Sequence, residues 1–192
     1  LVEGLEEAFA GRGRLFLLVG EPGIGKSRLA EELVAHAKAR GARVLVGRCW
    51  EAGGAPPYWP WWQVLRALAN TVDLAAIARR RRLTIELSGV APDVFGPDDA
   101  AQESRGSPED RFRQFDAVAR LLREVCRQTP LVIVLDDVHW ADKPTLLLLQ
   151  HVARSLTDER LLLVANTRVS DQQHGEVLAR LVREPVTTLI TL

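Results

Sequence analysis

Apolar residues are arranged along this chain in two patterns. Unbroken apolar runs are typical of strands buried on both faces, whereas apolar residues at every third or fourth position are typical of helices. The first pattern predicts strands at Leu15–Val19, Val44–Val46, Leu131–Leu135 and Leu161–Ala165, and a less regular terminal strand is predicted at Val186–Leu192. The second pattern predicts helices over Val2–Phe9, Leu29–Ala37, Trp61–Ala69, Phe112–Val125, Pro144–Leu156 and Glu176–Val182.

Strands that alternate with helices in this order predict an α/β domain with a mainly parallel sheet and right-handed crossovers. We expect residues 1–192 to form a single domain, with residues 59–129 as a helical insertion between the second and third strands. Residues 88–110 are rich in Gly, Pro, Ser, Asp and Glu, which predicts a mobile surface loop. The chain has no methionine, even at position 1, and is therefore expected to be part of a longer protein.

Composition narrows the class of protein. The 25 Lys and Arg residues balance the 25 Asp and Glu residues, and 47% of the chain is hydrophobic, which is ordinary for a globular domain. Neutrality disfavours a dedicated nucleic-acid module or a polybasic membrane binder. Cys49 and Cys126 have no metal-ligand spacing and imply no disulfide framework. No apolar stretch approaches the roughly 18 residues of a membrane span. We therefore expect a cytoplasmic protein without membrane contact.

A phosphate-binding loop is the strongest chemical signal. Residues 20–27 read Gly-Glu-Pro-Gly-Ile-Gly-Lys-Ser, which fits the G-x-x-x-x-G-K-[ST] pattern between a buried strand and a helix. Glycines let backbone N–H groups turn toward phosphate oxygens, Lys26 reaches the β- and γ-phosphates, and the Ser27 hydroxyl can bind Mg²⁺. The alternative is a glycine-rich turn with a surface lysine. The expected nucleotide-binding residues are Gly20, Glu21, Pro22, Gly23, Ile24, Gly25, Lys26, Ser27 and Arg28.

Two carboxylates, Asp136 and Asp137, follow the buried strand Leu131–Leu135. Open α/β sheets bind ligands at the carboxyl ends of their strands, so this position favours a site. We predict that Asp136 holds Mg²⁺ together with Ser27. Asp137 is then the candidate that orients or deprotonates the attacking water. Without the phosphate loop, the same dipeptide would be interpreted as turn chemistry or a helix cap.

Most residues in the segment after Asp137 are predicted to have structural rather than catalytic roles. Asp142 is predicted to be the N-cap of the following helix, with Pro144 in its first turn. Trp140 is interpreted as a packing residue under the site. His139 is either a phosphate sensor or a surface group.

Polar residues at a later strand end leave alternatives open. Asn166 or Arg168 would report on the γ-phosphate if their strand lies between the two motif strands, and otherwise they form a polar strand end. The run Arg79–Arg82 is interpreted as a solvated helix face rather than a docking site for a partner or nucleic acid. The tryptophans within residues 59–62 are interpreted as core packing rather than a ligand stack.

These motifs together resemble one family. The segments are GEPGIGKSRLAEEL, GRCWEAGGAPPYWPWWQVLRAL, RFRQFDAVARLLREV, LVIVLDDVHWAD, LLLVANTR and VLARLVREPVTTL. In this order they resemble the AAA-type, STAND-class P-loop ATPases, especially the ATPase module of large LuxR-type and MalT-like transcriptional regulators and of adenylate-cyclase-linked proteins. The stretches GRCWE to WPWW and DDVHWAD are more specific than the phosphate loop.

The resemblance implies a three-layer αβα sandwich whose sheet order is 5-1-4-3-2. It also implies ATP or ADP and Mg²⁺ as ligands, and slow hydrolysis that resets a molecular switch. Carried over by motif position, Lys26 and Ser27 bind phosphate and metal, Asp136 binds metal, Asp137 is the catalytic carboxylate and Arg168 is the sensor. The expected partners are ATP, other domains of the parent protein and a second copy on ATP binding, without direct nucleic-acid contact.

Two other functions stay open at this point. The chain would be a nucleotide-locked scaffold if bound ATP or ADP stabilised one conformation with negligible turnover. A small-molecule phosphotransferase would need an acceptor pocket and a lid with several arginines, and the sequence shows neither clearly. GTP is disfavoured because the sequence contains no Asn-Lys-x-Asp tetrapeptide.

Overall fold

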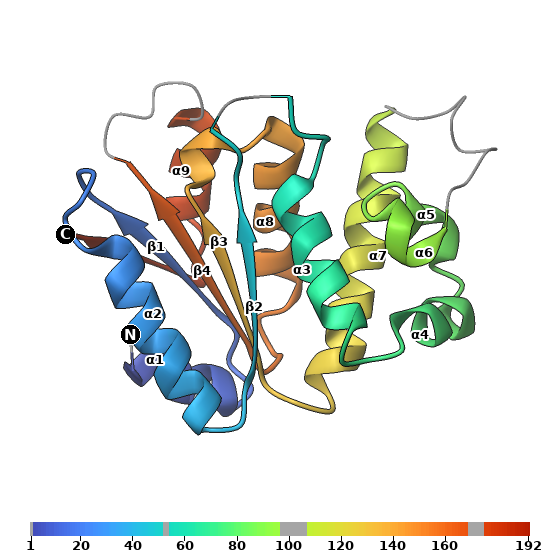
Figure 1. Cartoon of the computed structure of the whole chain (residues 1–192), viewed down its shortest axis with the longest axis horizontal. Coiled ribbons are helices and arrows are strands. Elements are labelled where there is room, and N and C mark those ends of the chain that lie inside the picture. The colour runs from blue at the N-terminus through green and yellow to red at the C-terminus, as the bar shows by residue number, and fades with distance from the viewer. Residues whose placement is uncertain (1, 52–53, 97–106, 169–174) are drawn as a thin grey trace.

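A computed structural model describes residues 2–51, 54–96, 107–168 and 175–192 (Figure 1). Its strands form one five-stranded parallel sheet in the order β2-β3-β4-β1-β5. The strands are β1 (Arg14–Val19), β2 (Arg43–Arg48), β3 (Leu131–Asp136), β4 (Leu161–Thr167) and β5 (Thr187–Thr191). This order is 5-1-4-3-2 read from the other edge, so the expected α/β fold and strand order are confirmed.

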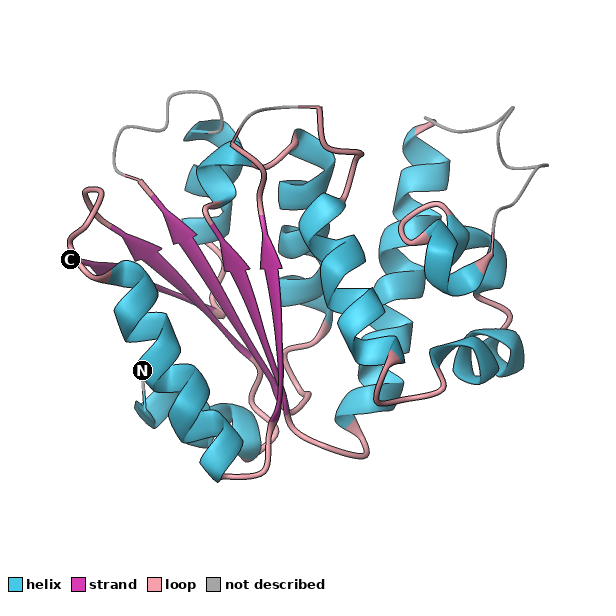
Figure 2. Cartoon of the chain, in the orientation of Figure 1, coloured by secondary structure: helices cyan, strands magenta, loops and turns pink. Residues whose placement is uncertain are grey.

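Helices cover both faces of the sheet, as Figure 2 shows, and the central strands are therefore buried on both sides. Phe16 and Leu18 of β1 face one helical layer, whereas Leu15 and Leu17 face the other. Side chains alternate between the faces of a strand, so an unbroken apolar run serves both layers. The helices are α1 (Val2–Phe9), α2 (Lys26–Ala39), α3 (Trp59–Ala69), α4 (Leu74–Arg81), α5 (Thr84–Ser88), α6 (Pro92–Phe95), α7 (Pro108–Cys126), α8 (Lys143–Ser155) and α9 (Gly175–Val182).

The segment between β2 and β3 is helical, as predicted, and contains α3 to α7. Helix α3 packs so closely on β2 that only a glycine fits at position 47. A Cβ on Gly47 would lie 2.2 Å from the carbonyl oxygen of Pro60. The α7 helix begins at an N-cap, Ser107, whose side chain accepts a hydrogen bond from the backbone of Asp110. Figure 1 shows α4, α5 and α6 on the side of α7 away from the sheet.

Part of the expected loop over residues 88–110 has regular structure instead. Val90, Ala91 and Phe95 are buried in the main core, α6 forms around Pro92, and α7 begins at Pro108. Helix α5 contacts α7 and α6 contacts α3, so these few apolar residues join the main core although most of their sequence neighbours are polar. Residues 97–106, the rest of that expected loop, lie outside the described residues.

The parallel sheet brings the carboxyl ends of its strands to one edge, which is the upper edge in Figure 1. The loop after β1 and the residues that end β3 and β4 meet there. Among the described residues, no helix is both long and apolar enough to cross a membrane.

Candidate nucleotide-binding site

The loop between β1 and α2 has the backbone geometry that its glycines permit. Gly23 has φ 78° and Gly25 has φ 112°, both in the left-handed region that residues with a side chain rarely adopt. Gly25 is also the N-cap of α2, and as a glycine it has no side chain to cap this helix end. The first N–H groups of a helix have no carbonyl partner within it, so this end is suited to an anion.

Lys26 folds back over the loop. Its Nζ donates hydrogen bonds to the carbonyl oxygens of Gly20 at 2.8 Å and of Glu21 at 2.9 Å, and the residue is buried. An ammonium group has three donors, so one N–H remains for a phosphate oxygen. The two carbonyl contacts hold the ammonium at the loop before any nucleotide arrives. Ser27 lies next to it and is exposed.

Asp136 ends β3 and is held from the neighbouring strands. Asn166 of β4 donates a hydrogen bond from Nδ2 to Asp136 Oδ1 at 2.6 Å. Arg48, which is opposite Asp136 in the β2–β3 register, places its Nε 3.9 Å from Asp136 Oδ2. The Asp136 side chain is only 16% exposed. Asp136 therefore has a defined orientation at the carboxyl edge.

Asp137 points elsewhere because the chain turns at the strand end. Its φ of 56° is left-handed, a conformation that Asp and Asn tolerate better than most residues. Its side chain is 51% exposed. The turn separates the two adjacent carboxylates, so they have different surroundings.

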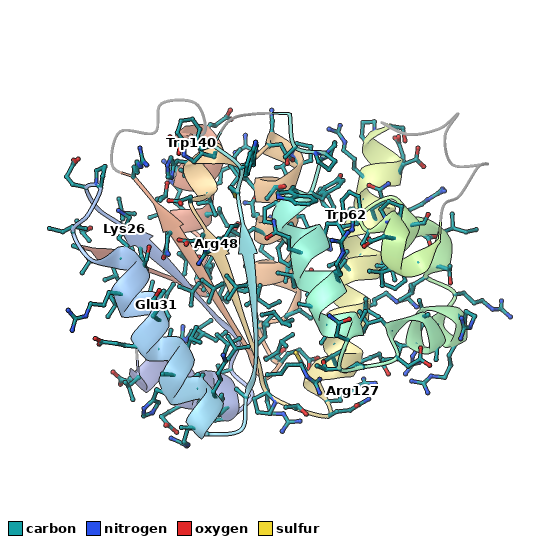
Figure 3. The ribbon with its side chains drawn as sticks, in the orientation of Figure 1. Lys26, Glu31, Arg48, Trp62, Arg127 and Trp140 are labelled. Carbon is teal, nitrogen blue, oxygen red and sulfur yellow. The ribbon has the colours of Figure 1, made fainter. Side chains whose placement is uncertain are left out.

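The phosphate loop and Asp137 line one cavity of about 310 Å³, together with Arg168, the residue after β4. The guanidinium of Arg168 lies over the Trp140 ring, 5.9 Å from its centroid. Figure 3 shows Lys26, Arg48 and Trp140 toward the carboxyl edge. The lining residues are Pro22, Gly23, Gly25, Lys26, Ser27, Arg28, Asp137 and Arg168.

The cavity thus brings together most of the residues expected from the sequence. Gly20 and Glu21 take part through their carbonyl oxygens, which hold Lys26. Ile24 is 53% exposed and is not among the lining residues. Asp136 does not line the cavity either, but it precedes the lining residue Asp137 and contacts β4 through Asn166.

Carboxylates at the carboxyl edge affect the pKa of the nearby Cys49 thiol. Burial, followed by the charges of Asp142, Asp137 and Asp136, raises the pKa of Cys49 to about 12. The thiol is therefore neutral and unreactive at neutral pH.

The residues present fit Mg²⁺ rather than a metal held only by protein. Within the described ranges, no group of three or more His, Cys, Asp or Glu side chains is arranged to hold a metal ion. Mg²⁺ is usually bound by one or two protein oxygens together with water and phosphate oxygens. Asp136 and the exposed Ser27 hydroxyl can supply the protein oxygens for such a site.

The segment after Asp137 matches the sequence predictions only in part. Asp142 is the N-cap of α8, accepting a hydrogen bond from the backbone N–H of Thr145 at 2.8 Å, as predicted. The interpretation of His139 as a surface group is wrong, because it is buried. The interpretation of Trp140 as a packing residue under the site is also wrong, because the residue is 38% exposed and contacts Arg168. Both residues belong to a short 3₁₀ helix, Val138–Trp140, whose rotation turns neighbouring side chains in different directions.

The structure also bears on the predictions for the end of β4, for the arginine run and for the tryptophans. The strand of Asn166 and Arg168 does lie between the two motif strands. Arg79–Arg82 are all exposed at the end of α4, as expected of a solvated face, but Arg81 also forms an ion pair with Glu124 of α7. Trp61 is fully buried and donates a hydrogen bond from Nε1 to the Thr145 carbonyl, so it is a core residue.

Sequence reasoning missed Arg48. The residue lies two positions after the predicted strand Val44–Val46, and in a 5-1-4-3-2 sheet that strand neighbours the one that ends in Asp136. The signal was therefore present in the strand order combined with the common carboxyl edge.

Comparisons with known proteins give the chain a family. The AAA ATPase domain family matches residues 1–164. An uncharacterized protein of Rhizobium meliloti (strain 1021) is 33% identical over 175 residues, which cover 84% of this chain and 17% of that protein. The chain thus spans about a sixth of the length of this relative.

Solved structures with a similar fold are more distant in sequence. A Signal Transduction ATPase with Numerous Domains (STAND) protein with a tetratricopeptide repeat sensor, from Pyrococcus horikoshii, has a TM-score of 0.48 and 15% identity, with 100% of this chain and 22% of that chain covered. A chain of the Drosophila ORC complex bound to GC-rich DNA and Cdc6 has a TM-score of 0.48 and 11% identity, with 99% of this chain and 52% of that chain covered. The family match extends from the first residue through the phosphate loop and both aspartates into β4, and on this basis the chain belongs to the AAA ATPase domain family.

Proposed function

We propose that this domain binds ATP with Mg²⁺ and hydrolyses it slowly, as a nucleotide switch in a larger signalling or transcription regulator of the STAND class. The observation that carries the proposal is the cavity in which the phosphate loop, Asp137 and Arg168 meet. Three kinds of group needed for phosphoryl transfer are close together there: N–H donors and a lysine for the phosphates, a carboxylate for water, and a second cation.

The binding roles follow from the contacts. Lys26 meets the β- and γ-phosphates with the donor that the Gly20 and Glu21 carbonyls leave free. The N–H groups at the start of α2 bind the same phosphates. Ser27 and Asp136 would hold Mg²⁺, and the bound ion would neutralise part of the charge on the phosphates. Asn166 orients Asp136 through the 2.6 Å hydrogen bond.

Asp137 is the proposed base for hydrolysis. Asp137 lines the same cavity as the loop and its side chain is half exposed, so water can reach the carboxylate. It accepts a proton as water oxygen bonds to the γ-phosphorus, and the bond from that phosphorus to the bridging oxygen breaks to leave ADP and phosphate. Arg168 faces the same space and stabilises charge on the transferred group.

The switch role is supported by the resemblance of the motifs to STAND-class regulators. In such a role Arg168 and the exposed Trp140 are the residues through which a change in the γ-phosphate would reach other parts of the protein. The partners proposed are other domains of the parent protein and a second copy of the domain in the ATP-bound form.

Phosphate release tests the enzyme against the scaffold. The chain is mixed with ATP and Mg²⁺, and phosphate is followed alongside calorimetric binding of ATP. Turnover above background that disappears in Asp137→Asn supports hydrolysis. Tight binding without phosphate release in the wild type favours the nucleotide-locked scaffold. Unchanged ATP affinity in Lys26→Ala would contradict the assignment of the loop.

A further inference from the structure

A second cavity, of about 400 Å³, lies in the helical insertion. The residues before α3, the turn between α5 and α6, the start of α7 and Pro144 of α8 surround it. None of the residues of the phosphate loop contributes to its lining. A volume of this size falls in the range of about 300–1,000 Å³ that is typical of small-molecule sites.

The walls of this insertion cavity are apolar and held in place. Tyr58 is buried and packs edge-on against Phe115, with 6.1 Å between the ring centroids. Trp62, which Figure 3 labels on α3, donates from its indole N–H to Asp93, and Arg66 lies over its ring. Together with nearby prolines, these rings form a wall that needs little reordering to receive a flat apolar group.

One cation faces this space. Arg111 lines the insertion cavity, and among the described residues it has no ion-pair partner. It lies near the N-terminus of α7, where the helix dipole disfavours a cation. An anionic ligand would relieve this cost and accept charge-assisted hydrogen bonds from the guanidinium. Gln114, one helical turn further on, accepts a hydrogen bond from the Tyr58 hydroxyl at 3.3 Å and adds a polar amide to the same wall.

A direct contact joins this cavity to the segment that follows the catalytic carboxylates. Tyr58 has a left-handed backbone, with φ 64°, and its N–H donates to Asp142 Oδ2 at 3.2 Å. The other oxygen of Asp142 caps α8 by accepting from the Thr145 N–H. Only the short 3₁₀ helix Val138–Trp140 and Ala141 separate Asp137 from Asp142. A ligand that presses on Tyr58 therefore acts on the residue that anchors this segment.

We propose that the insertion cavity binds a small organic carboxylate with a flat apolar body, and that this ligand is an effector of the nucleotide site through the Tyr58–Asp142 contact. The apolar body lies against Tyr58 and Trp62, and the carboxylate pairs with Arg111. The effector part rests on the proposed ATP-binding function, whereas carboxylate binding does not.

Ligand-observed NMR titration tests the binding part, with 2-naphthoate as the probe and its neutral amide, 2-naphthamide, as the matched compound. Loss of one charge-assisted contact weakens binding by about tenfold to a hundredfold. We therefore expect 2-naphthoate to bind the wild type at least tenfold more tightly than the amide. Arg111→Gln should lose this preference and Arg111→Lys should keep part of it. Arg113→Gln, an exposed arginine on the same helix, is the control and should bind as the wild type does.

Equal affinities for acid and amide in the folded wild type would overturn the binding proposal without any variant. So would an unchanged naphthoate affinity in Arg111→Gln, or no naphthoate binding at all.

Reciprocal coupling tests the effector part. ATP·Mg²⁺ affinity is measured with and without saturating 2-naphthoate, and a change of about fivefold or more is expected in either direction. The affinity of naphthoate must change by the same factor when ATP is present. Asp142→Ser retains a side-chain cap for α8 but removes the carboxylate that accepts from Tyr58, and should reduce the coupling.

The outcomes separate the two proposals. Lys26→Ala should lose ATP binding and retain naphthoate binding. If the wild type binds naphthoate with the expected preference but no nucleotide, the proposed function fails and the carboxylate site stands. If both ligands bind and neither affects the other, the cavity is not an effector site.

Discussion

Asn166 holds Asp136 across two neighbouring strands: the Asn166 amide donates to Asp136 Oδ1 at 2.6 Å, and Asn166 itself is buried. This hydrogen bond uses Oδ1 and fixes the plane of the carboxylate, so the Asn166 amide does not occupy Oδ2 of Asp136. A carboxylate that must meet a metal ion gains from such support, because outer partners orient the ligand.

Asn166→Ala should therefore weaken Mg²⁺-dependent ATP binding by about tenfold to a hundredfold, the usual effect of removing an outer partner of a metal ligand. ATP affinity measured by calorimetry over a range of Mg²⁺ concentrations checks this. Thr167→Val is the matched control, since the Thr167 hydroxyl is buried and has no hydrogen-bond partner among the residues that the structure describes. Equal loss in both variants would indicate a general disturbance of β4 rather than a role for Asn166.

Lys26→Ala should weaken ATP binding by about 2–5 kcal/mol, because it removes one partner of a desolvated charge pair. It also frees the Gly20 and Glu21 carbonyls, so a thermal melt should confirm that the fold persists. Lys38→Ala, an exposed lysine in the last turn of the same helix, should leave ATP affinity unchanged. Calorimetry distinguishes the two variants directly.

Asp136 and Asp137 should show separable effects. Asp136→Asn should weaken Mg²⁺-dependent binding, whereas Asp137→Asn should leave ATP and Mg²⁺ affinity nearly intact and lower turnover by about 10²–10⁴. Asparagine tolerates the left-handed backbone at position 137, so the second variant isolates the charge from the turn. Phosphate release and calorimetry on both variants check this. The opposite assignment of effects would reverse the two roles.

His151 should make folding stability fall at acidic pH. Burial against Phe112 and Phe115 lowers the pKa of His151 below 6.5, with the nearby charges of Asp116 and Arg154 acting in opposite directions. The unfolded chain then binds the proton more readily than the folded chain. The contribution to stability is present above the unfolded pKa and is lost as pH falls below it.

Urea unfolding at about pH 7.5 and about pH 5.5 measures this contribution, since the two values lie on either side of an ordinary histidine pKa. The difference in unfolding free energy between the two conditions should be smaller in His151→Gln than in the wild type. His36→Gln, on the exposed surface of α2, is the control. An equal difference in all three proteins would contradict a role for His151.

The sequence by itself determined the fold class and located the glycine-rich loop between β1 and α2. Unbroken apolar runs are required wherever a strand has helices on both faces, so β1, β3 and β4 were evident from their residues. The loop could be predicted for a similar reason, since its glycines and Lys26 act through spacing within one short segment. Asp142 likewise caps the helix that begins at the next residue by accepting from the Thr145 N–H three residues further on, so a local rule was sufficient.

Only the tertiary structure decided which residues from different elements meet. Arg48, Asp136 and Asn166 are far apart in the chain and come together because three parallel strands end at one edge. The burial of Val90 and Phe95 depends on the contacts of α5 with α7 and of α6 with α3, which no local pattern describes. The exposure of Trp140 depends on the 3₁₀ turn after Asp137. Hydrophobic periodicity shows which side of an element faces a core, whereas packing between elements determines which side chains share a site.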